Sequence, residues 1–282
     1  MFMRGLVIMH KMQIKAIAFS AIFGASSLLF SQTALEVVTT YKNLPCPNYS
    51  STNIILEEIS PNGQITERNE VKQYGKILRN DTINTVFEWE SPASRKNTRV
   101  LQAEKVGRTD DSMIYTPELR QVRRVSTAAR KNSVVGTELT YNDLRIREVE
   151  DDTHEMLEDN DTITISSGTT YTCWQIKSTP IKKSEVEYSY RITWFDKQTY
   201  LPVQVKYYDR KTKDLFKTFE IEKIDHVKGT TGREYVLRRS CYVTNEKTGR
   251  KTHIYVRDFV FDAPNVNDSY FTQSWMLTGK AR

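Results

Sequence analysis

Segments of β-type sequence recur along most of this chain of 282 residues, separated by turns too short to hold a helix. Asn62-Gly63 is typical of a two-residue hairpin turn, and short polar turns follow at residues 196–199 and 245–249. Parallel strands need a crossover of about a dozen residues or more, so these short connections require antiparallel neighbours. The pattern therefore predicts an antiparallel meander.

The expected strands divide into two groups with a different segment between them. They are residues 54–59, 65–78, 83–89, 99–106, 112–115, 170–177, 188–195, 203–207, 215–224, 235–243, 252–261 and the tail around Phe271. Ten or more strands in series favour a mainly β fold of the α+β kind, built as one strongly curved sheet or an open barrel. Hydrophobic residues make up 38% of the chain, which is enough for a core.

Helical sequence is expected at two places. In residues 34–43, Leu35, Val38 and Tyr41 share one face at helical spacing, and two prolines follow. A second helix is predicted near residues 143–158, with Leu144, Val149 and Leu157 as its sparse apolar contacts. This helix would lie in an insertion whose basic part, residues 119–131, precedes an acidic part, residues 148–161.

The N-terminus has the pattern of a secretory signal peptide. Residues 1–15 carry three basic residues and no acid, and residues 16–30 are uncharged and mostly apolar. A run of 15 residues rises only about 22 Å as a helix, which is short for a transmembrane anchor, the alternative considered. We therefore expect a signal peptide at residues 1–33, starting at Met1 or Met12, and one domain at residues 34–282.

Removal of this segment changes the expected partners. The net charge of +6 includes its three basic residues and falls to +3 without them, which weakens the case for a nucleic-acid partner. Export also implies an oxidising compartment, so Cys173 and Cys241 are candidates for a disulfide; the alternative is three free thiols.

Motifs of catalysis, metal binding and cofactor binding are missing from the sequence. His154-Glu155 begins like a zinc-protease helix, but Glu158 replaces the second histidine ligand. The chain also lacks a nucleophile elbow, a phosphate-binding glycine loop and a dinucleotide fingerprint. We therefore expect a protein without enzymatic activity, metal or cofactor.

Several segments resemble outer-membrane lipoprotein-sorting proteins of the LolA-like superfamily. Residues 114–126 read IYTPELRQVRRVS, which resembles the family stretch YLPxLRRVRRI. The other similar segments are residues 136–144 (GTELTYNDL), 171–174 (YTCW), 193–197 (TWFDK), 201–202 (LP), 205–209 (VKYYD) and 271–272 (FT). They occur in the family's order, although Glu138 and Leu139 stand where the family usually has Asp and an aromatic residue.

The resemblance implies an unclosed, strongly curved antiparallel β half-barrel with a helical lid over its concave face. It also implies a periplasmic carrier for a lipid or an acylated lipoprotein, with transient membrane contact and an inner-membrane transporter or exporter as a further partner. The segment between Thr127 and Asp161 is the expected lid.

Residues expected at the binding site follow from this architecture. The apolar cavity is expected to include Phe87, Trp89, Leu101, Trp194 and Val205, each of which has ordinary core packing as its alternative. Arg120, Arg123 and Arg124 are expected to hold the lid through carboxylates such as Asp143, or to touch an anionic lipid or a partner protein; a solvated basic edge is the alternative.

Two other functions fit the same sequence. Related half-barrels bind a lipoprotein or a lipid signal and regulate a membrane partner without carrying cargo. An exported structural or adhesion protein is the third reading. Transfer of lipid between membranes by the soluble protein would distinguish the carrier from both.

Overall fold

The computed structural model describes residues 32–78, 82–105, 110–145 and 147–281. Most of the expected signal peptide, residues 1–31, lies outside these residues. Among the described residues, no helix is both long and apolar enough to cross a membrane.

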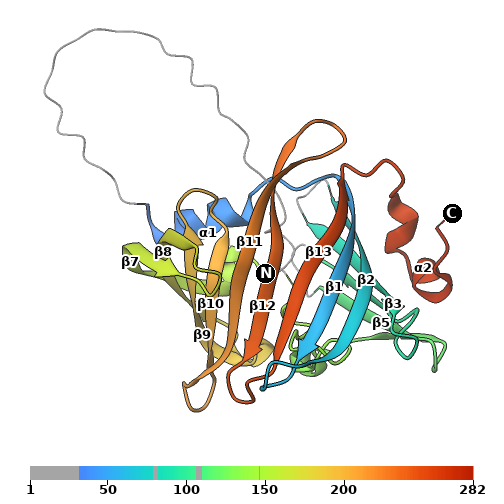
Figure 1. Cartoon of the computed structure of the whole chain (residues 1–282), viewed down its shortest axis with the longest axis horizontal. Coiled ribbons are helices and arrows are strands. Elements are labelled where there is room, and N and C mark those ends of the chain that lie inside the picture. Colours follow the sequence, from blue (N-terminus) through green and yellow to red (C-terminus); the bar gives the residue numbers. More distant parts are fainter. Residues whose placement is uncertain (1–31, 79–81, 106–109, 146, 282) are drawn as a thin grey trace, which may run out of the picture.

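Thirteen strands form one antiparallel sheet in the part of the chain that the structure describes (Figure 1). They are β1 (Tyr49–Ile59), β2 (Ile65–Ile77), β3 (Ile83–Ser91), β4 (Arg99–Ala103), β5 (Asp111–Thr116), β6 (Gln121–Arg124), β7 (Asp152–Thr164), β8 (Thr170–Pro180), β9 (Tyr188–Asp196), β10 (Pro202–Asp209), β11 (Leu215–Lys228), β12 (Glu234–Asn245) and β13 (Lys251–Phe261). The helices are α1 (Ala34–Lys42) and α2 (Gln273–Thr278), with 3₁₀ turns η2 (Thr127–Lys131), η3 (Val149–Asp151), η4 (Lys183–Glu185) and η5 (Asp268–Phe271).

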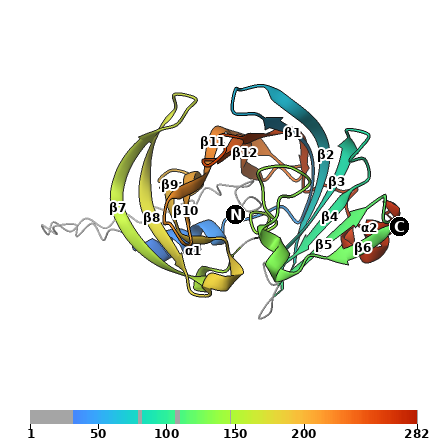
Figure 2. The ribbon, with the colours of Figure 1, turned by 90° about the horizontal axis from the view of Figure 1, so that it is seen from below.

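The sheet is open because its two outermost strands do not pair with each other. Its order runs from β6 through β1 to β13 and then back to β7, so β1 and β13 join two meanders at the centre. The edge strands β6 and β7 are consecutive in the chain, and the connection between them must cross the opening. Figure 2 shows the resulting curve, with this connection inside it. The predicted unclosed, curved antiparallel sheet is confirmed.

Alternation along the strands decides which side chains face into the curve. Phe87 on β3 is paired with Val100 on β4, and both belong to the main apolar cluster inside the sheet. Their neighbours Val86 and Leu101 are also paired, and they point to the opposite face. Successive residues of a strand face opposite sides of the sheet. The Phe87–Val100 pair therefore packs in the cluster inside the curve, and the Val86–Leu101 pair packs in the cluster on the outer face.

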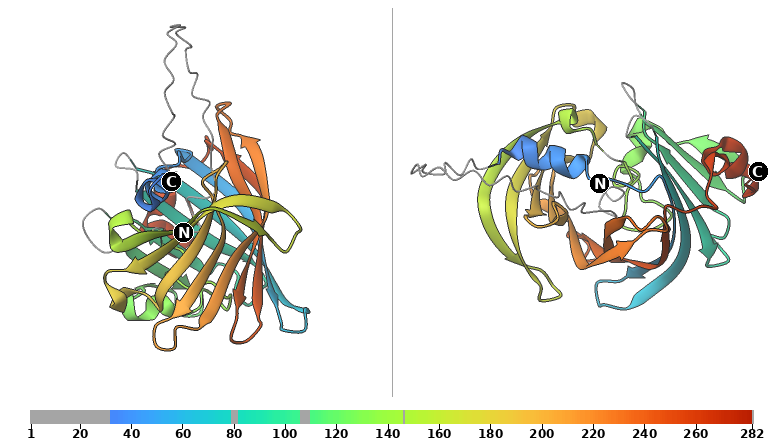
Figure 3. Two further views of the ribbon diagram at one scale, coloured as in Figure 1. Left: turned by 90° about the vertical axis from the view of Figure 1, so that its left-hand side faces the viewer. Right: turned by 90° about the horizontal axis from the view of Figure 1, so that it is seen from above.

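Two helices cover different faces of the sheet. Helix α1 lies on the inner side of the sheet at its β8–β9 end (Figure 3). Its residues Val37, Val38 and Tyr41 belong to one apolar cluster with residues of these strands. Helix α2 lies outside the curve, where Trp275 and Met276 cover Val86 and Leu101. The predicted first helix is confirmed, but Leu35 is 57% exposed and is not part of its buried face.

The prediction of a second helix at residues 143–158 was wrong. The segment forms loop, η3 and the beginning of β7, and β7 pairs with β8 as an edge strand. An edge strand is solvated on its open side and can carry many charges, so its apolar residues were too sparse to reveal the β period. The tail around Phe271 is likewise η5 and α2 instead of a strand.

Candidate functional site: two pockets beside an inner loop

Residues 132–145, here called the inner loop, lie within the curve of the sheet (Figure 2). An isolated bridge between Ser133 and Thr140 closes the loop on itself. Gly136 at its tip has φ of +83°, a conformation that side chains with a Cβ rarely adopt. The expected helical lid is therefore replaced by an irregular loop whose apolar side chains face the sheet.

An apolar pocket lies between the inner loop and the sheet. Its lining residues are Ile54, Leu56, Val71, Gln73, Phe87, Trp89, Val134, Thr137, Leu139, Leu144, Arg238, Cys241, Ile254 and Val256. The empty volume is about 700 Å³, which includes space open to solvent. The loop thus supplies one wall, and strands β1–β3, β12 and β13 supply the others.

The five residues expected in the cavity are divided among three clusters. Phe87 and Trp89 line the apolar pocket, and Val205 belongs to the same apolar cluster without lining the pocket. Leu101 packs under α2 on the outer face. Trp194 lies in a separate cluster with Cys173, and its ring nitrogen donates to Asp161 at 2.7 Å. Leu101 and Trp194 therefore pack in clusters away from the apolar pocket, which agrees with ordinary core packing.

A buried ion cluster of Lys217, Asp143 and Glu187, here the Lys217 cluster, ties the inner loop to β11. The ammonium of Lys217 donates to both Asp143 oxygens at 2.8 Å and to Glu187 Oε1 at 3.3 Å. Burial lowers the pKa of Lys217, but the two carboxylates outweigh this effect and raise it above its usual value. The lysine is therefore charged, and its attraction holds Asp143 against the sheet.

Polar contacts also fix the rest of the inner loop. Glu138 accepts from Asn245 at 3.0 Å and forms an ion pair with Arg250 at 3.0 Å, while its backbone N–H donates to Thr252. Glu187 accepts from Asn142 at 2.6 Å. The loop is therefore held by a few polar contacts to strands and hairpins that are distant in the sequence.

The three arginines expected to hold the lid lie elsewhere. Arg120 is in the turn before β6 with φ of +48°, and Arg123 and Arg124 are exposed on β6. Arg124 pairs with Asp111 of the neighbouring strand. The structure does not bring these arginines to Asp143, whose carboxylate pairs with Lys217 of β11.

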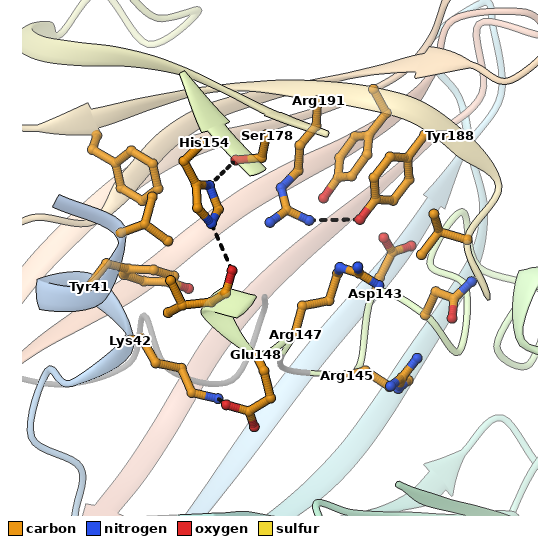
Figure 4. Close-up of a pocket in the computed structure, with 16 residues that line it drawn as sticks. Tyr41, Lys42, Asp143, Arg145, Arg147, Glu148, His154, Ser178, Tyr188 and Arg191 are labelled. Atoms are coloured by element: carbon orange, nitrogen blue, oxygen red, sulfur yellow. Dashed lines mark hydrogen bonds and ion pairs between the residues drawn. The ribbon is translucent and has the colours of Figure 1, made fainter. Parts of the chain in front are cut away.

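A second, charged pocket lies on the other side of the inner loop (Figure 4). Its lining residues are Val38, Tyr41, Lys42, Asn142, Asp143, Arg145, Arg147, Glu148, Val149, His154, Ser178, Val186, Tyr188, Arg191, Phe195 and Tyr207. The empty volume is about 750 Å³, again including open space. Both pockets thus use the inner loop as a wall: Leu144 faces the apolar pocket, and Asn142, Asp143 and Arg145 face the charged one.

One carboxylate in this region binds two guanidinium groups, and we call this set the Asp152 cluster. Asp152, whose side chain is fully buried, accepts from Arg147 at 2.7 Å and from Arg191 at 2.8 Å. Burial raises the pKa of Asp152, but Arg191 and Arg147 outweigh it and bring the pKa below its usual value. The carboxylate is therefore ionised at neutral pH.

His154 lies beside the Asp152 cluster on β7. Its ring nitrogens contact the Ser178 hydroxyl and the Val149 carbonyl, both at 2.9 Å. Burial is the main cause of its lowered pKa, which keeps the ring neutral at pH 7. His154 falls within the helix predicted at residues 143–158, but the structure places it half-buried on strand β7.

Cys173 and Cys241 are both buried free thiols, so the disulfide considered between them is not formed; Cys46 is buried as well. The two thiols belong to different clusters: Cys173 packs with Trp194, and Cys241 lines the apolar pocket. Within the described ranges, no group of three or more His, Cys, Asp and Glu side chains is placed to hold a metal ion.

The thiols of Cys173 and Cys241 are expected not to react in the folded protein. Burial raises the pKa of each to about 12, so at pH 8 only about one thiol in 10⁴ is the reactive thiolate. A thiol-reactive disulfide reagent, with modified peptides mapped by mass spectrometry, should label both only in denaturant. Fast labelling of Cys241 in a protein with native circular dichroism would contradict the closed pocket.

The sequence contained a signal for one of the two ion clusters. Lys217 shares strand parity with Phe219 and Ile221, and a lysine on an apolar strand face requires a buried acidic partner. No comparable signal pointed to Arg147 and Arg191, because their common partner Asp152 lay in the segment assigned to a helix.

A family model matches residues 81–278, more than half of the chain, and its description reads "-like: Uncharacterized protein". The chain belongs to that family. No curated protein matches its sequence.

Solved structures identify the fold of this family member. A domain described as outer membrane lipoprotein-sorting, from Vibrio parahaemolyticus, is 20% identical with a TM-score of 0.73, covering 86% of this chain and 98% of that one. A DUF1329 family protein from Desulfovibrio piger is 20% identical with a TM-score of 0.74, covering 86% and 97%. A LolA superfamily protein from Nitrosomonas europaea is 17% identical with a TM-score of 0.60, covering 86% and 99%. The chain therefore has the LolA-like fold, and the resemblance in its sequence is confirmed.

Proposed function

We propose that this protein is a periplasmic carrier that binds a lipid, or the acyl chains of a lipoprotein, between its sheet and its inner loop. The observation that carries the proposal is the apolar pocket with one wall formed by a loop (residues 132–145) that polar contacts hold in place. The LolA-like fold and the signal-peptide pattern support the same function and compartment.

The free-energy cost of exposing an acyl chain to water explains why a carrier needs a pocket that a movable loop can close. Each methylene that leaves a membrane for water costs about 0.8 kcal/mol, so a chain of about 15 methylenes costs roughly 12 kcal/mol. A carrier must offer matching apolar surface and hide it when empty. In the closed state Leu139 and Leu144 are 6% and 4% exposed, so the loop shields the pocket. Displacement of the loop would open it.

Lipid that co-purifies with the mature protein is the direct test. Mass spectrometry of an organic extract should find an acylated molecule, and the stripped protein should bind a fluorescent fatty acid near Trp89. A protein that purifies without lipid and also fails to bind the fatty acid would contradict the carrier proposal. Transfer of lipid between two vesicle populations, followed by fluorescence, separates a carrier from a sensor that binds without transferring.

Leu139→Glu is expected to weaken fatty-acid binding by at least about tenfold. The substitution places a carboxylate in the apolar pocket, where burial of an unpaired charge is costly. Leu119→Glu is the matched control, because Leu119 is 45% exposed in the turn before β6. Equal affinities of the two variants would show that the fatty acid binds outside this pocket.

Partner proteins are proposed to meet the exposed β6 edge. Arg123 and Arg124 project from it, and Arg120 lies in the turn before it. An acidic surface of an inner-membrane transporter or exporter would complement this charge.

A further inference from the structure

The Asp152 cluster carries one more positive than negative charge. Arg147 and Arg191 both pair with the single carboxylate of Asp152. Arg147 directs Nε and Nη2 to Asp152, and Nη2 also to the backbone carbonyl of Asp151. Its third nitrogen, Nη1, is buried in a side chain that is 9% exposed, and it has no hydrogen-bond partner among the described residues. A buried cationic donor without an acceptor is costly, so the cluster is incomplete as it stands.

The other acidic side chains that line the charged pocket pair with basic groups other than Arg147 and Arg191. Asp143 shares Lys217 with Glu187, at 2.8 Å and 3.3 Å, and Glu148 pairs with Lys42 at 2.9 Å. The Lys217 cluster therefore carries one excess negative charge, which balances the excess positive charge of the Asp152 cluster within this region. What remains for a ligand is the unfilled hydrogen-bond donor of Arg147, Nη1.

Both guanidinium groups belong to side chains that line the charged pocket. Figure 4 shows the head groups of Arg147, Arg191 and Tyr188 in the middle of the charged pocket, with Arg191 donating to the Tyr188 hydroxyl at 2.7 Å. Asp152 fixes both arginines in position, so an entering anion would find donors that are already oriented.

The inner loop places this charged site next to the apolar one. Leu144 faces the apolar pocket, while Asp143 and Arg145 on either side of it face the charged pocket. A molecule with an acyl chain and an acidic head could therefore occupy both pockets on the two sides of this loop.

We infer that the charged pocket binds an anionic group, a carboxylate or a phosphate, through Arg147 and Arg191. Where this group is the head of the acylated cargo, the inference rests on the proposed function, because the chain would then extend past the inner loop into the apolar pocket. The same chemistry would also take a small free anion.

The test compares ligands that differ in their head groups. Binding of palmitate, palmitoyl lysophosphatidic acid, monopalmitoylglycerol and inorganic phosphate to the stripped mature protein is measured by calorimetry. The wild type is expected to bind the two anionic acyl probes at least about tenfold more tightly than uncharged monopalmitoylglycerol. Arg147→Gln should abolish this preference while it keeps the affinity for monopalmitoylglycerol, and Arg147→Lys should restore part of it. Arg210→Gln, at an exposed turn between β10 and β11, should behave as wild type.

The outcomes separate this inference from the carrier proposal. Equal binding of charged and uncharged acyl probes by the wild type overturns the anion site but leaves the carrier intact, and this comparison needs no variant to fold. A preference retained in folded Arg147→Gln also overturns it. Phosphate binding that depends on Arg147, without binding of any acyl probe, supports a site for a free anion and contradicts the carrier. Binding of neither phosphate nor acyl probes contradicts both.

Discussion

Lys217→Met is expected to lower the free energy of unfolding by about 3–5 kcal/mol and to release the inner loop. The methionine fills much of the same space, but it leaves the buried carboxylates of Asp143 and Glu187 without their shared cation. Because the folded pKa of Lys217 is raised, its stabilisation is fully present below the unfolded value of about 10.4 and is lost as pH rises through the folded one. Urea unfolding at pH 7 therefore measures the whole effect.

Two controls show whether the loss comes from the loop. Lys211→Met, at an exposed position of the preceding turn, should change stability by less than about 0.5 kcal/mol. In Lys217→Met, thiol labelling should accelerate at Cys241, which lines the apolar pocket, but not at Cys173, which packs with Trp194. Equal acceleration at both thiols would indicate general unfolding and would refute a role for Lys217 in closing the pocket.

Asp152→Asn should be comparably destabilising, with a loss of about 3–5 kcal/mol at pH 7. The amide cannot neutralise Arg147 and Arg191, which are left as buried, mutually repelling charges. Arg191 and Arg147 hold the folded pKa of Asp152 below its usual value despite burial, so the stabilisation is present above the unfolded pKa of about 3.9. It is lost as pH falls through the lower folded pKa.

The pH dependence supplies the sharper measurement for this variant. The difference in unfolding free energy between wild type and Asp152→Asn should be constant from pH 7 to about pH 5 and shrink below about pH 4. Asp159→Asn, at an exposed position of the same strand, is the matched control and should change stability little. A difference that does not shrink in acid would show that Asp152 is not the ionised centre of the cluster.

Local sequence patterns predicted most strands but could not decide their faces. Strands β8–β13 were found because alternation and turn residues are properties of neighbouring residues. Phe87 and Leu101 both fitted a cavity, yet their cross-strand partners, Val100 and Val86, place them on opposite sides of the sheet. That choice depends on register, which involves residues on other strands.

The charged part of the site was predicted less well for a related reason. The acidic run was assigned to a helix, while the structure makes it an edge strand whose first residue, Asp152, turns inward to Arg191 on β9. Asp143 was named as one possible carboxylate partner of the arginines near β6, and in the structure its cation is Lys217 of β11. Ion pairs between residues so far apart in the sequence cannot be predicted from the spacing of residues along the chain.

The pairing of β1 with β13 at the centre of the sheet has a consequence for how the chain folds. Each meander is built from local hairpins, but Ser50 pairs with Phe261, near the other end of the described chain. This pairing must wait for almost the entire chain to emerge, and it carries a large loop-closure entropy. Until then the edge of β1 that faces away from β2 is unpaired, so we expect the joining of the halves to be the slowest and most aggregation-prone step of folding. A binding factor that shields the free edge of β1 until β13 arrives would reduce this aggregation.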